Sequence, residues 1–133
     1  MTKARIIGTG MAVPPRVVKN TDLEKLMDTS DEWITQRTGI KERRHVDQGM
    51  APVDLAFAAA NTALANAKTQ ASDLDLVLVA TLSADHVFPG TAAFLQAKLG
   101  LETTPSMDVR CQCSGFIYAI STARAFIQTG QYK

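Results

Sequence analysis

The run from Asp75 to Leu82, Asp-Leu-Val-Leu-Val-Ala-Thr-Leu, restricts the fold more than any other part of the chain, because it is almost continuously apolar. A strand with one face in water alternates apolar and polar residues, whereas a parallel strand covered on both faces is apolar throughout. The run therefore predicts a buried parallel strand that is not an edge strand and that has helices on both sides.

Helix and strand patterns alternate around this run. We expect helices over residues 52–67, 91–99 and 114–128, with Pro52 in the first turn of one and glycines just after the other two. Further strands are expected over residues 4–10, where a short strand ends in a glycine-rich turn, and over residues 106–110. This order predicts an α/β fold with right-handed crossovers and a mainly parallel sheet, of which at least one edge stays open.

The segment before residue 50 predicts two short helices. Thr21–Glu24 forms a capping box for a helix to about Met27, and Thr29–Glu32 is a second helix start, with Gly39 as the stop. Gly8-Thr9-Gly10 begins like a dinucleotide-binding fingerprint, but the third glycine is missing and Pro14-Pro15 prevents a following helix. The basic cluster Lys41–His45 is expected to be a solvated face.

Bulk properties exclude several classes of protein. The 133 residues, 46% hydrophobic and 20% charged, fit one globular domain over residues 1–133. A net charge of +1 predicts no nucleic-acid partner and no anionic membrane surface. No apolar run has the length of a transmembrane helix, and the beginning of the sequence lacks a signal-peptide pattern. The two cysteines are separated by one residue, too close for a useful disulfide crosslink, so no disulfide framework is expected and the reducing cytoplasm is the default compartment.

Cys113 is the strongest candidate for chemistry, because it lies where a strand pattern runs into a helix pattern. Free backbone N–H groups and the helix dipole favour a negatively charged group there, and the thiolate is the nucleophilic form of cysteine. From this segment alone, a small buried residue at a tight turn is equally consistent. Cys111 and Cys113 also leave a redox or metal module open, although only His45 and His86, each isolated, remain as further ligands.

Two further candidates concern binding. Trp33 and Arg37 share one helix face, where they predict either a site that stacks a flat aromatic ligand with its phosphates on the cation, or a cation–π pair at the margin of the core. Phe88 lies in the loop 83–90 after the buried strand, and is either a core plug or an anchor in a partner subunit. His86 in the same loop is a possible partner for Cys113.

Several segments together resemble the amino-terminal half of β-ketoacyl-acyl-carrier-protein synthase III, of the thiolase superfamily. The resemblance runs along the whole chain, and the segments that carry it are Ile6–Gly10, Asp28–Ile34, Arg37–Ile40, Phe88-Pro89 and Cys113–Phe116. It implies an incomplete thiolase-like α/β fold, a mainly parallel sheet with covering helices.

The resemblance also implies roles for single residues. Cys113 would take an acyl group from acyl-coenzyme A as a thioester, with its own backbone N–H as one oxyanion-hole donor. Trp33 and Arg37, with Thr29 nearby, would grip coenzyme A, and Phe88 would cross a homodimer interface and line the partner's acyl pocket. Malonyl-acyl-carrier protein would then lose carbon dioxide and condense with the thioester. Coenzyme A thioester is a substrate here, and no metal or redox cofactor is implied.

The chain departs from the family pattern in two ways. Arg110-Cys111-Gln112 is bulkier than the small residues common before the nucleophile, which leaves the acyl-chain preference open. The catalytic His and Asn of the family lie in the carboxy-terminal half, so we expect this chain to be one piece of a longer protein and to be unable to decarboxylate a malonyl thioester alone. Another thiolase-like condensing enzyme of secondary metabolism, or a non-catalytic subunit that completes a partner's active site, remains an alternative.

Overall fold

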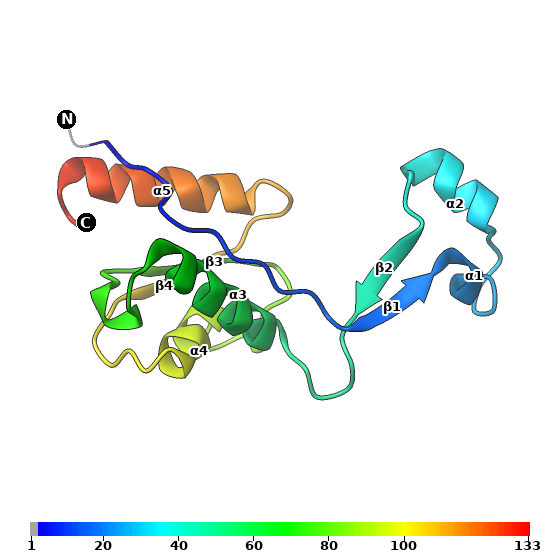
Figure 1. Cartoon of the computed structure of the whole chain (residues 1–133), viewed down its shortest axis with the longest axis horizontal. Coiled ribbons are helices and arrows are strands. Elements are labelled where there is room, and N and C mark those ends of the chain that lie inside the picture. The colour runs from blue at the N-terminus through cyan, green and yellow to red at the C-terminus, as the bar shows by residue number, and fades with distance from the viewer. Residues whose placement is uncertain (1–2) are drawn as a thin grey trace. The chain divides into compact units, whose positions relative to one another are not determined.

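A computed structural model describes residues 3–133 and divides the chain into two compact units (Figure 1). Unit 1 consists of Met1–Ala12 and Ala51–Lys133, and unit 2 consists of Val13–Met50. The single domain expected over residues 1–133 stays a prediction. None of the helices in the described part is both long enough and apolar enough to cross a membrane.

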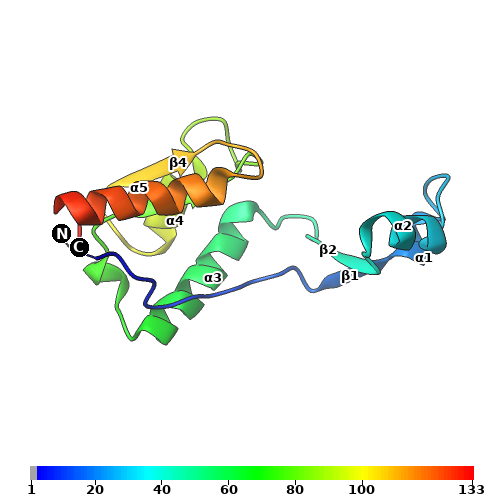
Figure 2. The ribbon, with the colours of Figure 1, turned by 90° about the horizontal axis from the view of Figure 1, so that it is seen from above.

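Unit 1 contains a small parallel sheet between helices. Its elements are α3 (Pro52–Ala67), the 3-10 turn η1 (Ala71–Asp73), β3 (Val77–Ala80), α4 (Thr91–Lys98), β4 (Ser106–Val109) and α5 (Gly115–Thr129). Strands β3 and β4 are parallel, with Val77 opposite Ser106. Helix α5 covers one face of the strands and α4 covers the other, with α3 packed on α4 (Figures 1 and 2). Val53, Val77 and Leu95 form the buried core.

The helices of unit 1 confirm the sequence predictions to within one residue at each end, because local signals fix their termini. The Asp54 carboxylate accepts the backbone N–H of Ala51 at 2.9 Å at the start of α3. Asp108, on β4, accepts the N–H of Ala92 at 3.2 Å at the start of α4. Gly130 ends α5 with a left-handed φ of 76°, a conformation that favours glycine.

The strand expected over residues 4–10 is wrong, since no strand is assigned there. This segment packs against α3 instead, where Asn66 donates to the Thr9 carbonyl at 2.8 Å. A Cβ on Gly8 would lie 2.8 Å from the Ala67 Cβ, and one on Gly10 would lie 2.6 Å from the Ala63 nitrogen. Gly8 and Gly10 therefore allow the close approach of this backbone to a helix.

The prediction that residues 75–82 form a strand away from the sheet edge is also wrong. Within the described residues the sheet has two strands only, so β3 and β4 are both edge strands. The parallel pairing and the helices on both faces are as predicted. An apolar run reports burial, but it does not report how many strands pair with it.

Unit 2 contains an antiparallel pair of strands that the sequence patterns did not predict. Its elements are β1 (Arg16–Lys19), α1 (Asn20–Leu23), α2 (Asp31–Thr38) and β2 (Glu42–His45). Arg16 pairs with His45, and Lys19 pairs with Glu42. The cluster Lys41–His45 is thus largely a strand, and its side chains are exposed as expected, except that Arg43 is partly buried.

Of the two short helices of unit 2, α2 agrees with the sequence prediction more closely than α1. Helix α1 begins one residue before the expected capping box and ends at Leu23, so the expected end near Met27 is wrong. Asp22 accepts the N–H of Lys19 at 3.0 Å. Glu24 instead accepts the N–H of Asp31 at 2.7 Å, at the start of α2. Helix α2 is confirmed, because the Ser30 hydroxyl accepts the Trp33 N–H at 3.0 Å and Gly39 has a left-handed φ of 73°.

Candidate functional site

Cys113 lies in the turn that joins β4 to α5, and its side chain is exposed. The Gly115 N–H donates to the Gln112 carbonyl at 2.9 Å and thereby tightens the turn. Ser114 is the N-cap residue of α5, but its side chain makes no capping hydrogen bond. No acceptor among the described residues takes the backbone N–H of Cys113, which leaves a donor free beside an accessible thiol. The buried-turn interpretation of Cys113 is therefore wrong for this chain.

Cys111 has a different environment from Cys113. It is partly buried, and its sulfur lies 3.7 Å from Gln112 Oε1 and 3.9 Å from the Ser114 hydroxyl. Both cysteines are free thiols. Across residues 3–133 no group of three or more His, Cys, Asp or Glu side chains gathers as a metal site would need. Cys111 is thus the less accessible of the two thiols.

The loop before α4 presents Phe88 to solvent, with 90% of the residue exposed. Phe88 is therefore not a core plug in this chain. The Arg110 guanidinium donates to the Val87 carbonyl at 2.9 Å and to the His86 carbonyl at 3.5 Å, which joins this loop to the residue directly after β4. In the sequence, Arg110 stands out only as a bulky, polar residue before Cys113. An arginine between a strand end and a nucleophile is a signal that could have indicated this contact.

The two histidines do not join the Cys113 site. The His86 ring packs on Phe94 with 4.9 Å between ring centroids, and no hydrogen bond in the described part links it to Cys113. His45 lies exposed on β2. The structure therefore does not form the Cys–His pair that the sequence left open.

Trp33 and Arg37 meet on one face of α2. The guanidinium carbon lies 4.7 Å from the ring centroid, and 53% of Trp33 is exposed. A half-exposed indole under a cation has a free surface for a second flat group. The cation–π contact is the one that the second interpretation predicts, and the exposed part of the indole is the surface that the binding interpretation needs.

Thr29 belongs to a surface pocket beside Trp33. The pocket has a volume of about 300 Å³ and is lined by Asp28, Thr29, Ser30 and Trp33. Its lining is mostly polar, with one aromatic wall, which suits a ligand that carries both a ring and hydroxyl groups. The structure therefore brings Thr29 and Trp33 together, as the sequence motif indicated.

Asp31 places a negative charge at the start of α2. A hydrogen bond from the Asn20 amide, aided by the Lys41 ammonium at 3.5 Å, holds the pKa of the Asp31 carboxyl below its ordinary value. The negative charge is also favourable at a helix N-terminus. Asp31 is thus ionised wherever the chain is folded near neutral pH, and Asn20, which sequence reasoning missed, is its principal partner.

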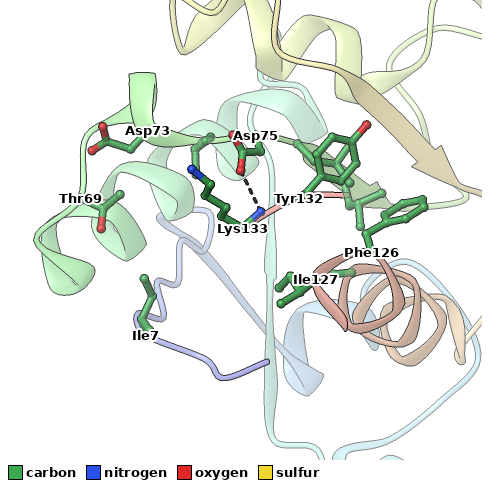
Figure 3. Close-up of a pocket in the computed structure, with 12 residues that line it drawn as sticks. Ile7, Thr69, Asp73, Asp75, Phe126, Ile127, Tyr132 and Lys133 are labelled. Carbon is green, nitrogen blue, oxygen red and sulfur yellow. Dashed lines mark hydrogen bonds between the residues drawn. The ribbon is translucent and has the colours of Figure 1, made fainter. Parts of the chain in front are cut away.

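A second pocket of about 300 Å³ lies in unit 1 and has a different character (Figure 3). Figure 3 shows Phe126, Ile127 and Tyr132 on one side and Asp73 and Asp75 on another, with the Lys133 N–H donating to Asp75 at 2.8 Å. Its lining contains neither cysteine nor the Trp33–Arg37 pair. We assign it no chemical role.

The fold and the exposed cysteine turn define an incomplete thiolase-like α/β protein. The crystal structure of 3-oxoacyl-[acyl-carrier-protein] synthase III from Aquifex aeolicus matches with a TM-score of 0.93 and 47% identity, over 100% of this chain and 42% of that one. The priming β-ketosynthase of the R1128 polyketide pathway matches with a TM-score of 0.93 at 29% identity, over 97% of this chain and 39% of that one.

Sequence comparisons point to the same proteins. A family model described as 3-oxoacyl-[acyl-carrier-protein] synthase III matches residues 107–133. β-Ketoacyl-[acyl-carrier-protein] synthase III of Thiobacillus denitrificans is 51% identical over 134 residues, and that of Caldanaerobacter subterraneus is 48% identical over 130 residues. These matches cover 100% and 98% of this chain, but 42% and 39% of the relatives. Over its whole length the chain is homologous to β-ketoacyl-[acyl-carrier-protein] synthase III, and it spans about two-fifths of such proteins.

Proposed function

We propose that residues 1–133 are the amino-terminal domain of a β-ketoacyl-acyl-carrier-protein synthase III, an acyltransferase that primes fatty-acid synthesis. The observation that carries the proposal is the exposed Cys113 thiol at the β4–α5 turn, in a chain about half identical to such synthases. Its substrates would be an acyl-coenzyme A primer and malonyl-acyl-carrier protein. With two free thiols, the chain suits the reducing cytoplasm.

In the loading step, the Cys113 sulfur attacks the carbonyl carbon of acyl-coenzyme A. A new carbon–sulfur bond forms, the bond to coenzyme A breaks, and coenzyme A leaves with the proton that Cys113 has lost. The free N–H of Cys113 is suited to stabilise the oxyanion of the tetrahedral intermediate. Because the step exchanges one thioester for another, its balance needs no electron acceptor.

In the condensation step, malonyl-acyl-carrier protein loses carbon dioxide, and the electron pair left on its carbon attacks the acyl group on Cys113. A carbon–carbon bond forms, the Cys113 thiolate leaves, and the product is 3-oxoacyl-acyl-carrier protein. The His and Asn that the resemblance implies for this step belong to the carboxy-terminal portion. The chain alone would therefore load an acyl group without condensing it.

Coenzyme A would bind through unit 2. Its adenine would stack on the exposed Trp33 ring, its phosphates would meet the Arg37 guanidinium, and Thr29 would contribute a polar wall. The 4.7 Å contact and the pocket of about 300 Å³ beside Trp33 support this assignment.

Phe88 would complete the acyl pocket of a second subunit. An aromatic side chain that is 90% exposed is costly to hydrate and is typical of an interface anchor. This supports a homodimer of the complete protein.

Another condensing enzyme of the same fold is the second candidate. The priming β-ketosynthase of a polyketide pathway has the same TM-score as the Aquifex synthase, although at lower identity. The bulky residues from Arg110 to Gln112, directly before Cys113, are also compatible with an unusual acyl primer.

Denaturing intact-mass spectrometry after incubation with acyl-coenzyme A tests the proposal. We expect a mass gain of one acyl group that maps to Cys113, is lost in Cys113→Ala and is kept in Cys111→Ala. An adduct at Cys111, or none at all, would contradict the proposed nucleophile. Clear condensation by the chain alone would contradict the need for a carboxy-terminal portion.

A further inference from the structure

Asn20 is the most completely buried polar residue of unit 2, with 1% of its surface exposed. Its Nδ2 group donates to Asp31 Oδ1 at 2.7 Å and to the Ile40 carbonyl at 2.8 Å, with Thr35 Oγ1 further away at 3.5 Å. Its Oδ1 accepts from the Arg43 guanidinium at 2.6 Å. One amide thus uses both of its donor hydrogens and its acceptor inside the protein.

These bonds connect both ends of α2 to the strand pair β1–β2. Asp31 is the first residue of α2, and Ile40 directly follows the Gly39 cap that ends it. Arg43 lies on β2 and also donates to the Val18 carbonyl of β1 at 3.2 Å. Asn20 itself follows β1 at the start of α1. A single side chain therefore fixes the start and the end of α2 against the strands.

Apolar packing offers α2 little alternative support. Within the described residues, the buried hydrophobic residues of unit 2 are Val18 and Ile34. Two aliphatic side chains set a distance between layers, but they do not fix the direction of a helix. Hydrogen bonds with defined geometry do, and a buried polar network is costly to leave partly satisfied.

We propose that Asn20 is the positioning residue for the coenzyme A grip. It holds α2 at both ends and so fixes how the face that carries Trp33 and Arg37 is oriented within unit 2. The inference rests on the proposed function, since it assumes that this pair binds the nucleotide part of coenzyme A. Asn20 touches no substrate, and its effect reaches the ligand only through α2. A small displacement of such a binding pair is enough to lower affinity strongly.

The variant Asn20→Asp tests this role, because it keeps the size of the side chain but replaces the donor by a second acceptor. A carboxylate at position 20 would face the Asp31 carboxylate and the Ile40 carbonyl, and only the Arg43 bond would remain. Combining it with Asp31→Asn exchanges donor and acceptor and restores the bond between the two side chains. Asn61→Asp, at an exposed position on α3 in unit 1, is the matched control.

Two readouts separate positioning from general stability. The first is the affinity of the chain for coenzyme A, compared with Cys113 loading from an acyl-pantetheine that lacks the nucleotide. The second is the ligand-free emission of Trp33, the one tryptophan of the sequence. For Asn20→Asp we expect coenzyme A binding to weaken about tenfold or more and the emission to shift, with acyl-pantetheine loading within about twofold of wild type. The double variant should recover part of both, because the bond to the Ile40 carbonyl stays lost, and Asn61→Asp should change neither.

The outcomes are distinct. Unchanged coenzyme A affinity in Asn20→Asp, or an equal loss with acyl-pantetheine, would overturn the positioning role. A wild-type chain that gains no affinity from the nucleotide would overturn the proposed coenzyme A grip itself, whatever the variants do. If Asn20→Asp loses its helical circular dichroism, Arg43→Lys applies a milder form of the test. It removes the guanidinium that reaches both Asn20 and Val18, and we expect about three- to tenfold weaker binding. Wild-type affinity in that variant would also overturn the inference.

Discussion

Arg37 holds its guanidinium carbon 4.7 Å from the centroid of the Trp33 ring, one helical turn further along α2. The contact covers part of the indole and leaves 53% of Trp33 exposed. Arginine suits such a position better than lysine, because its planar group stacks on an aromatic face and still presents a fork of donors to phosphate. The pair therefore combines a stacking surface with a charge, and the two functions are separable by substitution.

Arg37→Ala should weaken coenzyme A binding by about tenfold or more, since it removes charge-assisted hydrogen bonds to phosphate. Arg37→Lys should lie between this variant and wild type, because it keeps the charge but loses the planar fork. Titration calorimetry with coenzyme A and with pantetheine measures the difference. Arg124→Ala, at an exposed position on α5, is the control for loss of a cation. An equal loss with both ligands would count against a nucleotide-binding role.

Asp31 makes the stability of unit 2 depend on pH in the acid range. Its pKa is lowered in the folded chain, chiefly by the Asn20 hydrogen bond, whereas an unfolded aspartate has a pKa of about 3.9. A lowered pKa contributes stability that is fully present above the unfolded pKa and is lost as pH falls through the folded pKa. Urea unfolding followed by Trp33 emission should therefore weaken from about pH 5 to about pH 3, and less steeply in Asp31→Asn. Equal slopes would show that Asp31 is not the titrating group.

Local signals explain which elements the sequence predicts well. Ser30 and Gly39 define α2, and Pro52 defines the start of α3, through bonds or dihedral angles within a few residues. The sequence does not predict the antiparallel pair β1–β2, because its short strands carry Arg16, Lys19 and Glu42, which give no apolar alternation. The pairing also depends on contacts between segments that are distant in the sequence. Segment 4–10 differs for the opposite reason: Ile6 and Ile7 give a strand-like pattern but stay largely exposed, and the backbone packs on α3 at Gly8 and Gly10 without pairing.

The candidate site divides in the same way. Cys113 at a strand–helix junction and the spacing of Trp33 and Arg37 are visible in a few consecutive residues, so the sequence alone indicates them. Asn20 is not visible in this way, because its partners lie 11 to 23 residues away and the side chain looks like a helix cap. Long-range hydrogen bonds of this kind become apparent only in three dimensions.

Gly10 should tolerate no side chain. A Cβ there would overlap the Ala59 carbonyl and lie 2.6 Å from the Ala63 nitrogen, both of which are backbone atoms of α3 that cannot turn aside. We expect Gly10→Ala to destabilise unit 1 by about 1–3 kcal/mol, the usual cost of overpacking. Gly115→Ala is the contrast, because its Cβ would find the nearest atoms at an ordinary 3.7 Å. Thermal unfolding of both variants measures the difference, and equal midpoints would refute the close packing of residues 8–10 on α3.

Arg110 should hold the loop that presents Phe88. Its guanidinium donates to the Val87 and His86 carbonyls, and no other described group supplies a side-chain donor to these two oxygens. Loss of these exposed hydrogen bonds should lower the free energy of local loop opening by a modest amount. Arg110→Ala should therefore accelerate amide exchange over residues 83–90 by about two- to tenfold. Arg110→Lys should give a smaller effect, and Arg124→Ala none. Under the proposed function, the looser loop should also broaden the range of acyl groups that the complete dimer accepts, with loading of Cys113 by a short acyl group unchanged. Wild-type exchange rates in Arg110→Ala would mean that the loop is held by its other bonds, such as the one from the Asp85 N–H to the Thr91 hydroxyl at 3.4 Å.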